Sequence, residues 1–320
     1  MNAYRLLLAG IAFACLLLSA VPLAANAACA TRADLDERYC DADKDYVADA
    51  PVDPAKWRDP QTLVWAYAPI EEPAVYAGLF KDFTTHLGTC LGRQIVYYPV
   101  QSSNAEIEAM RSGRLHFAGF STGPTVEAVN RAGAVPFAAK GIGSDVRGYN
   151  LIAIVRADSA FKSLADLKGR RVAHASAFSN SGHLAPRALF PGEGLAPGVD
   201  YAPIMSGGHD KSILGVISGD YDMAAVASDV LERLIERRIV KREDLRVIFT
   251  SGIFPTSSFA YAHDLAPQLV DKMKQCFFEF EFTAEMKSEF HGDERFLPIR
   301  YDRDWASVRE VIDKAGASSF

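Results

Sequence analysis

Apolar positions along the chain, from residue 63 to residue 280, follow two alternating patterns. Compact apolar runs occupy 63–67, 94–100 and 115–120, and runs of this length are typical of buried strands. Between the first two runs, 74–91 carries apolar residues at the three- and four-residue spacing of a helix. Strands that alternate with helices predict a parallel α/β architecture.

The same alternation starts again after Gly148, which predicts a second lobe. We expect the first lobe to consist of 63–147 plus 252–320 and the second of 148–251, with hinge crossings near Gly148 and near 251–255. A cleft between two such lobes is a common ligand site, and closure about a hinge is an established motion. The predicted strands of the second block are 149–155, 171–175, 201–205, 223–226 and 245–250; strand 259–263 and helix 266–280 return to the first block, and a last helix covers 305–315.

The N-terminal residues have the features of an export signal. Arg5 precedes an apolar stretch over 6–18, and the small-x-small triplet 25–27 (ANA) is typical of a cleavage site. We therefore expect a signal peptide over 1–27 and a periplasmic protein. An uncleaved anchor is disfavoured because the apolar stretch is short for a membrane span, and acylation at Cys15 or Cys29 lacks a suitable preceding context. The following polar, Asp- and Pro-rich residues 28–62 predict a surface extension.

Composition and charge narrow the possible partners. The chain is 49% hydrophobic and 23% charged with a formal net charge of −6, and loss of Arg5 with the signal makes it −7 (−6 − 1). A mildly acidic chain without a run of Lys or Arg lacks the basic patch that is typical of nucleic-acid-binding proteins. Any anion site must therefore depend on local hydrogen bonds. We expect a monomer without a cofactor.

The cysteines predict disulfides in an oxidising compartment. Five are present, and Cys15 would leave with the signal, so four remain. Three pairings of these four are possible, and spacing alone does not choose among them. We favour Cys29–Cys40 and Cys90–Cys276, with buried free thiols as the alternative.

The segment from Ser179 to Gly182 is the most prominent candidate for anion binding. It follows a predicted strand and begins a predicted helix, whose N-terminus presents unpaired N–H groups and a partial positive charge. Ser179, Asn180 and Ser181 add polar side chains, and Gly182 would let the backbone approach a ligand. Together they predict a cradle that needs no Lys or Arg. The alternative is ordinary helix capping.

Two further strand-to-helix junctions have similar chemistry. Residues 206–210 (SGGHD) place His209 after two glycines, and 121–125 (STGPT) place Ser121 and Thr122 before a helix. Ligands gather at the carboxyl ends of strands in α/β sheets, so these junctions should lie near the first. Tyr67 and Ser103 are weaker candidates at other strand ends.

These motifs resemble the phosphate/phosphite/phosphonate-binding proteins of ABC importers. The resemblance rests on 179–186 (SNSGHLAP), 206–210 and 219–222 (GDYD) and runs from about residue 63 to residue 280. It implies a two-lobed periplasmic binding protein of type II-like fold in which Ser179, Asn180, Ser181 and His209 bind the phosphonate oxygens. Its acidic pair for an ammonium group corresponds here to Asp229 and Ser257, so one acid is missing. A simple oxyanion is therefore favoured over an aminophosphonate, although Asp229 is equally suited to cap a helix.

The resemblance extends to relatives that sense arsenic oxyanions for a two-component histidine kinase. Arsenite would favour a soft thiolate, and 100–106 contains no Cys; arsenate stays open. Our hypothesis is capture of a phosphonate, phosphite or phosphate for an ABC permease, with the arsenic sensor as the alternative. A phosphoester hydrolase is disfavoured because the sequence has no H-E-x-x-H and no Walker-type loop.

One acidic cluster has partial calcium-loop spacing. Asp41, Asp43 and Asp45 alternate as in an EF-hand loop, but Tyr46 replaces the glycine and no Glu closes the loop. The pattern favours a solvated acidic loop over a calcium site.

Overall fold

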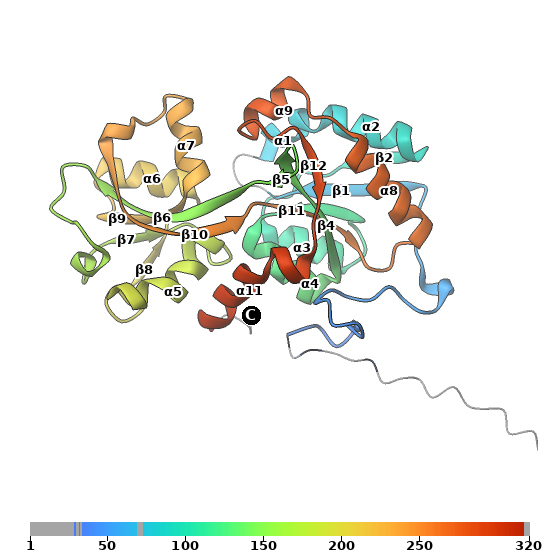
Figure 1. Cartoon of the computed structure of the whole chain (residues 1–320), viewed down its shortest axis with the longest axis horizontal. Helices are drawn as coiled ribbons and strands as arrows, with labels where there is room; N and C mark the ends of the chain where they lie inside the picture. Colours follow the sequence, from blue (N-terminus) through green and yellow to red (C-terminus); the bar gives the residue numbers. More distant parts are fainter. Residues whose placement is uncertain (1–28, 30–31, 33, 69–72, 317–320) are drawn as a thin grey trace, which may run out of the picture.

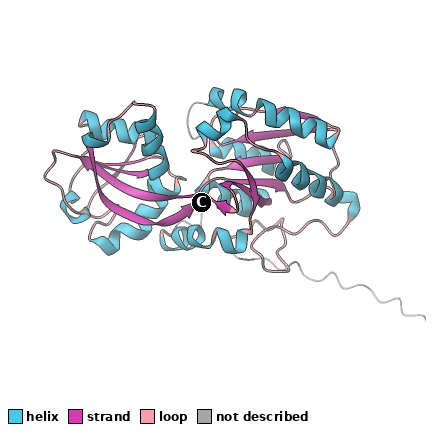
Figure 2. Ribbon diagram, turned by 45° about the horizontal axis from the view of Figure 1, so that its top comes forward, coloured by secondary structure: helices cyan, strands magenta, loops and turns pink. Residues whose placement is uncertain are grey.

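The computed structural model describes residues 29, 32, 34–68 and 73–316 and forms two lobes side by side (Figure 1). The predicted signal peptide, 1–27, lies outside the described residues. Each lobe is built on one sheet, with helices packed around the strands (Figure 2). Among the described residues, no helix is both long and apolar enough to cross a membrane.

The sheet of the first lobe has the strand order β12-β4-β11-β3-β1-β2, with β5 paired to β4. Strands β1, β2 and β3 are parallel, whereas β4, β11 and β12 run antiparallel to their neighbours. The strands are β1 (Thr62–Tyr67), β2 (Gln94–Tyr97), β3 (Phe117–Phe120), β4 (Ala134–Ile142), β5 (Asp145–Val146), β11 (Ser258–Ala262) and β12 (Arg295–Pro298); the helices are α1 (Pro73–Leu79), α2 (Lys81–Leu91), α3 (Ser103–Arg111), α4 (Thr122–Ala132), α8 (Pro267–Glu279) and α9 (Ala284–Glu289).

The sheet of the second lobe has the order β10-β6-β9-β7-β8. Here β7 is parallel to β8 and β9, while β6 is antiparallel to β9 and β10. The elements are β6 (Gly148–Arg156), β7 (Val172–His174), β8 (Pro203–Met205), β9 (Met223–Ala227), β10 (Leu245–Pro255), α5 (Ala185–Leu189), α6 (His209–Ser218) and α7 (Ser228–Glu236).

Both sheets are thus mixed: parallel strands, as predicted, are joined by antiparallel pairs that the sequence did not predict. One antiparallel pair follows the chain between the lobes: β6 and β10 pair along their length, from Arg156 opposite Leu245 to Gly148 opposite Pro255. The chain enters the second sheet at Gly148, directly after β5, and returns to the first sheet at Ser258. A hinge motion at these crossings stays a proposal.

Strand β4 was missed in the sequence. Its nine residues include Pro136 and Lys140, which interrupt the apolar pattern, yet most of the strand is buried. It lies between β11 and β12 in the sheet, so its neighbours cover it on both edges. Strand β12, Arg295–Pro298, was missed because it is short and mixed in polarity.

The C-terminal helices are α10 (Tyr301–Asp304) and α11 (Ala306–Lys314), and α11 packs against both lobes. Helix α11 contacts α4 of the first lobe and α5 of the second, and Figure 1 shows it beneath the junction. The buried indole of Trp305 donates to the Thr122 carbonyl oxygen at 3.1 Å. The predicted assignment of 252–320 to the first lobe therefore describes only part of the contacts of this segment.

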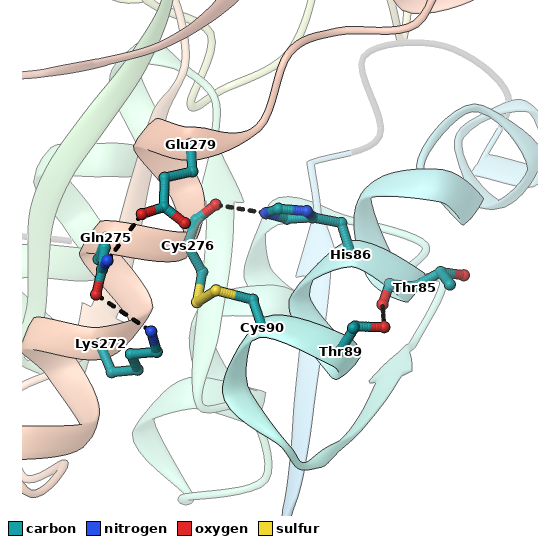
Figure 3. The surroundings of a disulfide bond; sticks show 8 residues. All are labelled: Thr85, His86, Thr89, Cys90, Lys272, Gln275, Cys276 and Glu279. Carbon is teal, nitrogen blue, oxygen red and sulfur yellow. Dashed lines mark hydrogen bonds between the residues drawn. A yellow bond between two sulfur atoms is a disulfide. The ribbon is translucent and has the colours of Figure 1, made fainter.

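Two disulfides are present, with the pairings that we favoured. Cys29–Cys40 closes a loop of the N-terminal extension, which lies on the first lobe through contacts such as the Arg58–Asp264 ion pair at 2.7 Å. Cys90–Cys276 joins α2 to α8, beside a 2.8 Å hydrogen bond from His86 Nε2 to the Cys276 carbonyl oxygen (Figure 3). A crosslink of such wide sequence separation restricts the unfolded chain strongly.

Candidate functional site

A cavity of about 520 Å³ lies between the lobes. Its walls come from the ends of β1 and β4 and the start of α4 in the first lobe, and from the starts of α6, α7 and the helix after Ser179 in the second. All ten residues predicted to bind a ligand line it except Gly182: Tyr67, Ser103, Ser121, Thr122, Ser179, Asn180, Ser181, His209 and Asp229.

Gly182 has a different role from the one expected. A Cβ atom at this position would lie 2.5 Å from Ala175 Cβ and 2.7 Å from Ser179 Oγ. The glycine is therefore needed so that the π-helical turn Asn180–Leu184 can pack against the end of β7. It shapes the cradle from behind and does not face the cavity.

His209 and Ser179 form a linked pair of donors. The Ala227 N–H donates to His209 Nδ1 at 3.2 Å, so the ring proton of the neutral imidazole is on Nε2. Burial lowers the pKa of His209 to about 4, so the ring is neutral near pH 7. Nε2 lies 3.0 Å from Ser179 Oγ, which also accepts from the Gly182 N–H at 3.0 Å. With two donors directed at its oxygen, the Ser179 hydroxyl has its own proton free for a ligand.

Several buried polar atoms at the cavity have no hydrogen-bond partner of good geometry. Four of them are Asn180 Oδ1, Ser181 Oγ, Asp229 Oδ1 and Thr256 Oγ1. Asn180 is only 2% exposed and Ser181 only 1%, and a buried polar group left unpaired is costly. Two of these atoms are acceptors and two are hydroxyls, so an occupant that both accepts and donates hydrogen bonds would satisfy them.

Thr122 lines the cavity, but its hydroxyl already donates a hydrogen bond within the protein. Its Oγ1 lies 2.9 Å from the Pro255 carbonyl oxygen, to which it donates, and so ties the start of α4 to the end of β10. That proton is not available to an anion. Ser121, by contrast, is the N-cap residue of α4 without a side-chain capping bond, so its hydroxyl is the better candidate of the two.

Several cavity residues were missed in the sequence, and three of them are Lys140, Tyr149 and Thr256. Lys140 donates to the Tyr67 hydroxyl and to Ser257 Oγ, both at 2.7 Å. The Tyr149 hydroxyl accepts from Asn180 Nδ2 at 3.2 Å. A single lysine within an otherwise apolar segment was the one signal that could have identified Lys140.

Among the described residues, an ion pair and a histidine–carboxylate contact connect the lobes at the edge of the cavity. Arg237, directly after α7, is 2.8 Å from Glu289 at the end of α9. His291 Nδ1 is 3.1 Å from Glu236 of α7. Each pair joins the second lobe to the first, so the structure holds the two walls together across the cleft.

The acidic cluster of the extension lies outside this cavity. Carboxylate oxygens of Asp41, Asp43 and Asp45 lie within 4.8 Å of one another. Arg32 Nε is 3.5 Å from Asp41 and supplies one positive charge. The weak calcium assignment stays a prediction.

The comparison with known proteins identifies the family. A family model described as "ABC transporter, phosphonate, periplasmic substrate-binding protein" matches residues 65–305. The chain belongs to this family. Among curated members, it is 28% identical over 283 residues to the phosphate-import protein PhnD of Mycolicibacterium smegmatis, which covers 81% of this chain and 87% of the relative. It is 26% identical over 186 residues to the phosphonates-binding periplasmic protein of Escherichia coli, covering 57% of this chain and 55% of that one.

Solved structures of the family confirm the predicted fold. A binding component of a Pseudomonas aeruginosa ABC phosphonate transporter superposes with a TM-score of 0.70 at 21% identity, covering 81% of this chain and 88% of that chain. PhnD1 of Prochlorococcus marinus, solved with methylphosphonate, also gives 0.70, at 19% identity, covering 81% and 100%. Family membership places the chain among periplasmic substrate-binding proteins of ABC transporters.

Proposed function

We propose that this protein captures a small tetrahedral oxyanion, a phosphonate, phosphite or phosphate, in the cavity between its lobes and presents it to an ABC permease. Family membership supports the class of transporter. The observation that supports this ligand is the set of buried polar atoms without a hydrogen-bond partner of good geometry at Asn180, Ser181, Asp229 and Thr256, next to the oriented Ser179 hydroxyl.

The chemistry of these groups suits a partly protonated oxyanion. The hydroxyls of Ser179 and Ser181 donate to its oxygens, and hydrogen bonds to a charged group are stronger than those between neutral groups. Asn180 Oδ1 and Asp229 Oδ1 can only accept. A hydroxyl on the ligand, as in hydrogen phosphate or a phosphonate monoanion, would meet one of them. Sulfate is fully deprotonated and would leave both acceptors unpaired, with its charge facing a carboxylate, so it should be rejected.

Several further properties belong to the same proposal. The protein is exported by the signal peptide 1–27, acts as a monomer and binds its ligand without chemical conversion. Curated relatives are named as import and binding proteins, which supports the last point. Among the described residues the cavity lining contains no Cys, so arsenite would lack a thiolate ligand. Arsenate resembles phosphate and needs no thiolate, so an arsenate sensor with a histidine kinase partner remains the alternative.

Titration calorimetry tests the proposal. Purified protein is titrated with phosphate, phosphite, methylphosphonate, arsenate, arsenite and sulfate, and small-angle scattering follows compaction. Saturable binding of at least one phosphorus oxyanion, with sulfate inert, is the expected result. Folded protein that binds none of the phosphorus oxyanions would refute the proposal.

A further inference from the structure

Lys140 is a buried cation in the wall of the first lobe. Its side chain leaves β4 toward the cavity, and the residue is only 6% exposed. Nζ lies 2.7 Å from the Tyr67 hydroxyl and 2.7 Å from Ser257 Oγ, and 4.4 Å from the centre of the Phe290 ring. These hydrogen bonds use two of the three ammonium protons.

No carboxylate among the described residues forms an ion pair with Lys140. The nearby buried carboxylate, Asp293, is held by Arg147 Nε at 3.0 Å. Lys140, Arg147 and Asp293 together therefore carry a net charge of +1 (2 − 1), and Glu289, the other carboxylate of this wall, is paired with Arg237 of the second lobe. Burial of an ammonium group with only neutral hydrogen-bond partners is unfavourable, and a bound anion would offset that cost.

We propose that Lys140 is the residue that selects the ligand by charge: it favours an oxyanion without a cationic group and excludes ligands that carry an ammonium group. This inference rests on the proposed function, because it assigns the class of oxyanion that the same cavity accepts. Ser257 supports it. Its hydroxyl accepts from Lys140, so this position of the cavity wall holds a neutral side chain against a cation and no carboxylate that could receive a ligand ammonium.

Charge selection makes the inference testable with two ligands of the same shape. Propylphosphonate and 2-aminoethylphosphonate have chains of equal length and differ by one methyl in place of one ammonium. Calorimetry should show that wild-type protein binds propylphosphonate at least about tenfold more tightly, since like charges placed together in a binding site are strongly unfavourable. In Lys140→Met, which keeps an unbranched apolar stem beside Phe290, that ratio should fall by about tenfold.

The ratio of the two affinities separates charge selection from a general loss of binding. Lys162→Met, an exposed lysine of the second lobe, is the matched control and should keep the wild-type ratio. Ser257→Asp gives Lys140 an internal counter-ion and should also lower the ratio, so it replaces Lys140→Met if that variant does not fold.

The outcomes are distinguishable. A wild-type protein that binds both ligands equally, or folded variants that keep the wild-type ratio, would overturn the role of Lys140 and leave the proposed function intact. A wild-type protein that binds no phosphorus oxyanion would overturn both.

Discussion

Removal of the Ser181 hydroxyl should affect binding and stability in opposite ways. Ser181 is 1% exposed, and its Oγ has no partner of good hydrogen-bond geometry, although the Tyr149 hydroxyl lies close by. In the ligand-free protein, Ser181→Ala removes a buried hydroxyl that forms no well-aligned hydrogen bond with its surroundings. In the complex, the same change removes a donor to the anion.

The magnitude follows from the charge on the ligand. A hydrogen bond to a charged group contributes about 1.5–3 kcal/mol. Its loss should therefore raise the Kd of Ser181→Ala by roughly 10- to 150-fold. The free energy of unfolding without ligand should stay unchanged or rise, because an unpaired buried polar group is itself unfavourable.

Ser258→Ala provides the matched control. Ser258 is also fully buried, but it lies 2.9 Å from Thr125 Oγ1, with which it shares a hydrogen bond, and it does not line the cavity. Its loss should lower the free energy of unfolding by about 1 kcal/mol and leave the Kd as it is. Calorimetry with methylphosphonate or phosphate and denaturant unfolding measure both quantities. The reasoning is refuted if Ser181→Ala lowers stability as much as Ser258→Ala while ligand affinity is retained.

Three other predictions concern the lobes and the buried titratable groups. Glu289→Gln weakens the ion pair with Arg237 across the cleft, so calorimetry should show a loss of affinity of about 0.2–1 kcal/mol. Burial lowers the pKa of His174 and His183 below 6.5; the unfolded chain therefore binds more protons, and denaturant unfolding should show stability falling as the pH drops below about 6.5. Burial raises the pKa of Glu106 well above 4.5, so stability is lost as the pH rises above 4.5, and Glu106→Gln should stabilise the protein at pH 8 more than at pH 5.

Each of these predictions has a control or a contradicting result. Glu285→Gln changes an exposed residue of the same helix as Glu289 and should leave affinity unchanged. Glu106→Gln removes the opposing titration of the buried carboxyl, and a stability of this variant that stays constant from pH 6.5 to pH 4.5 would contradict the assignment of neutral histidines. Glu193→Gln, at an exposed position, should show no pH-dependent stabilisation; an equal effect at Glu106 and Glu193 would show that the buried carboxyl is not the cause.

Local patterns in the sequence predicted much of the fold and one side of the candidate site. The turn from Ser179 to Gly182 was recognised because a strand end, a capping residue and a helix start are all encoded within a few residues. The buried strand β4 was not recognised, because Pro136 and Lys140 break its apolar run. Its burial depends on β11 and β12, which are contributed by the C-terminal part of the chain.

The sequence alone therefore determined the alternation of strands and helices, the family resemblance and the residues at the strand ends. Only the tertiary structure decided which of these residues have a free hydrogen-bonding atom. The Thr122 hydroxyl donates its proton to the Pro255 carbonyl oxygen, whereas the Ser181 hydroxyl has no hydrogen-bond partner of good geometry. Lys140 donates hydrogen bonds to Tyr67 and Ser257, which lie 73 and 117 residues away in the sequence. Local preferences cannot specify such contacts, because a hydrogen-bond partner depends on strand order and lobe packing, and these determine which distant atoms come within about 3 Å.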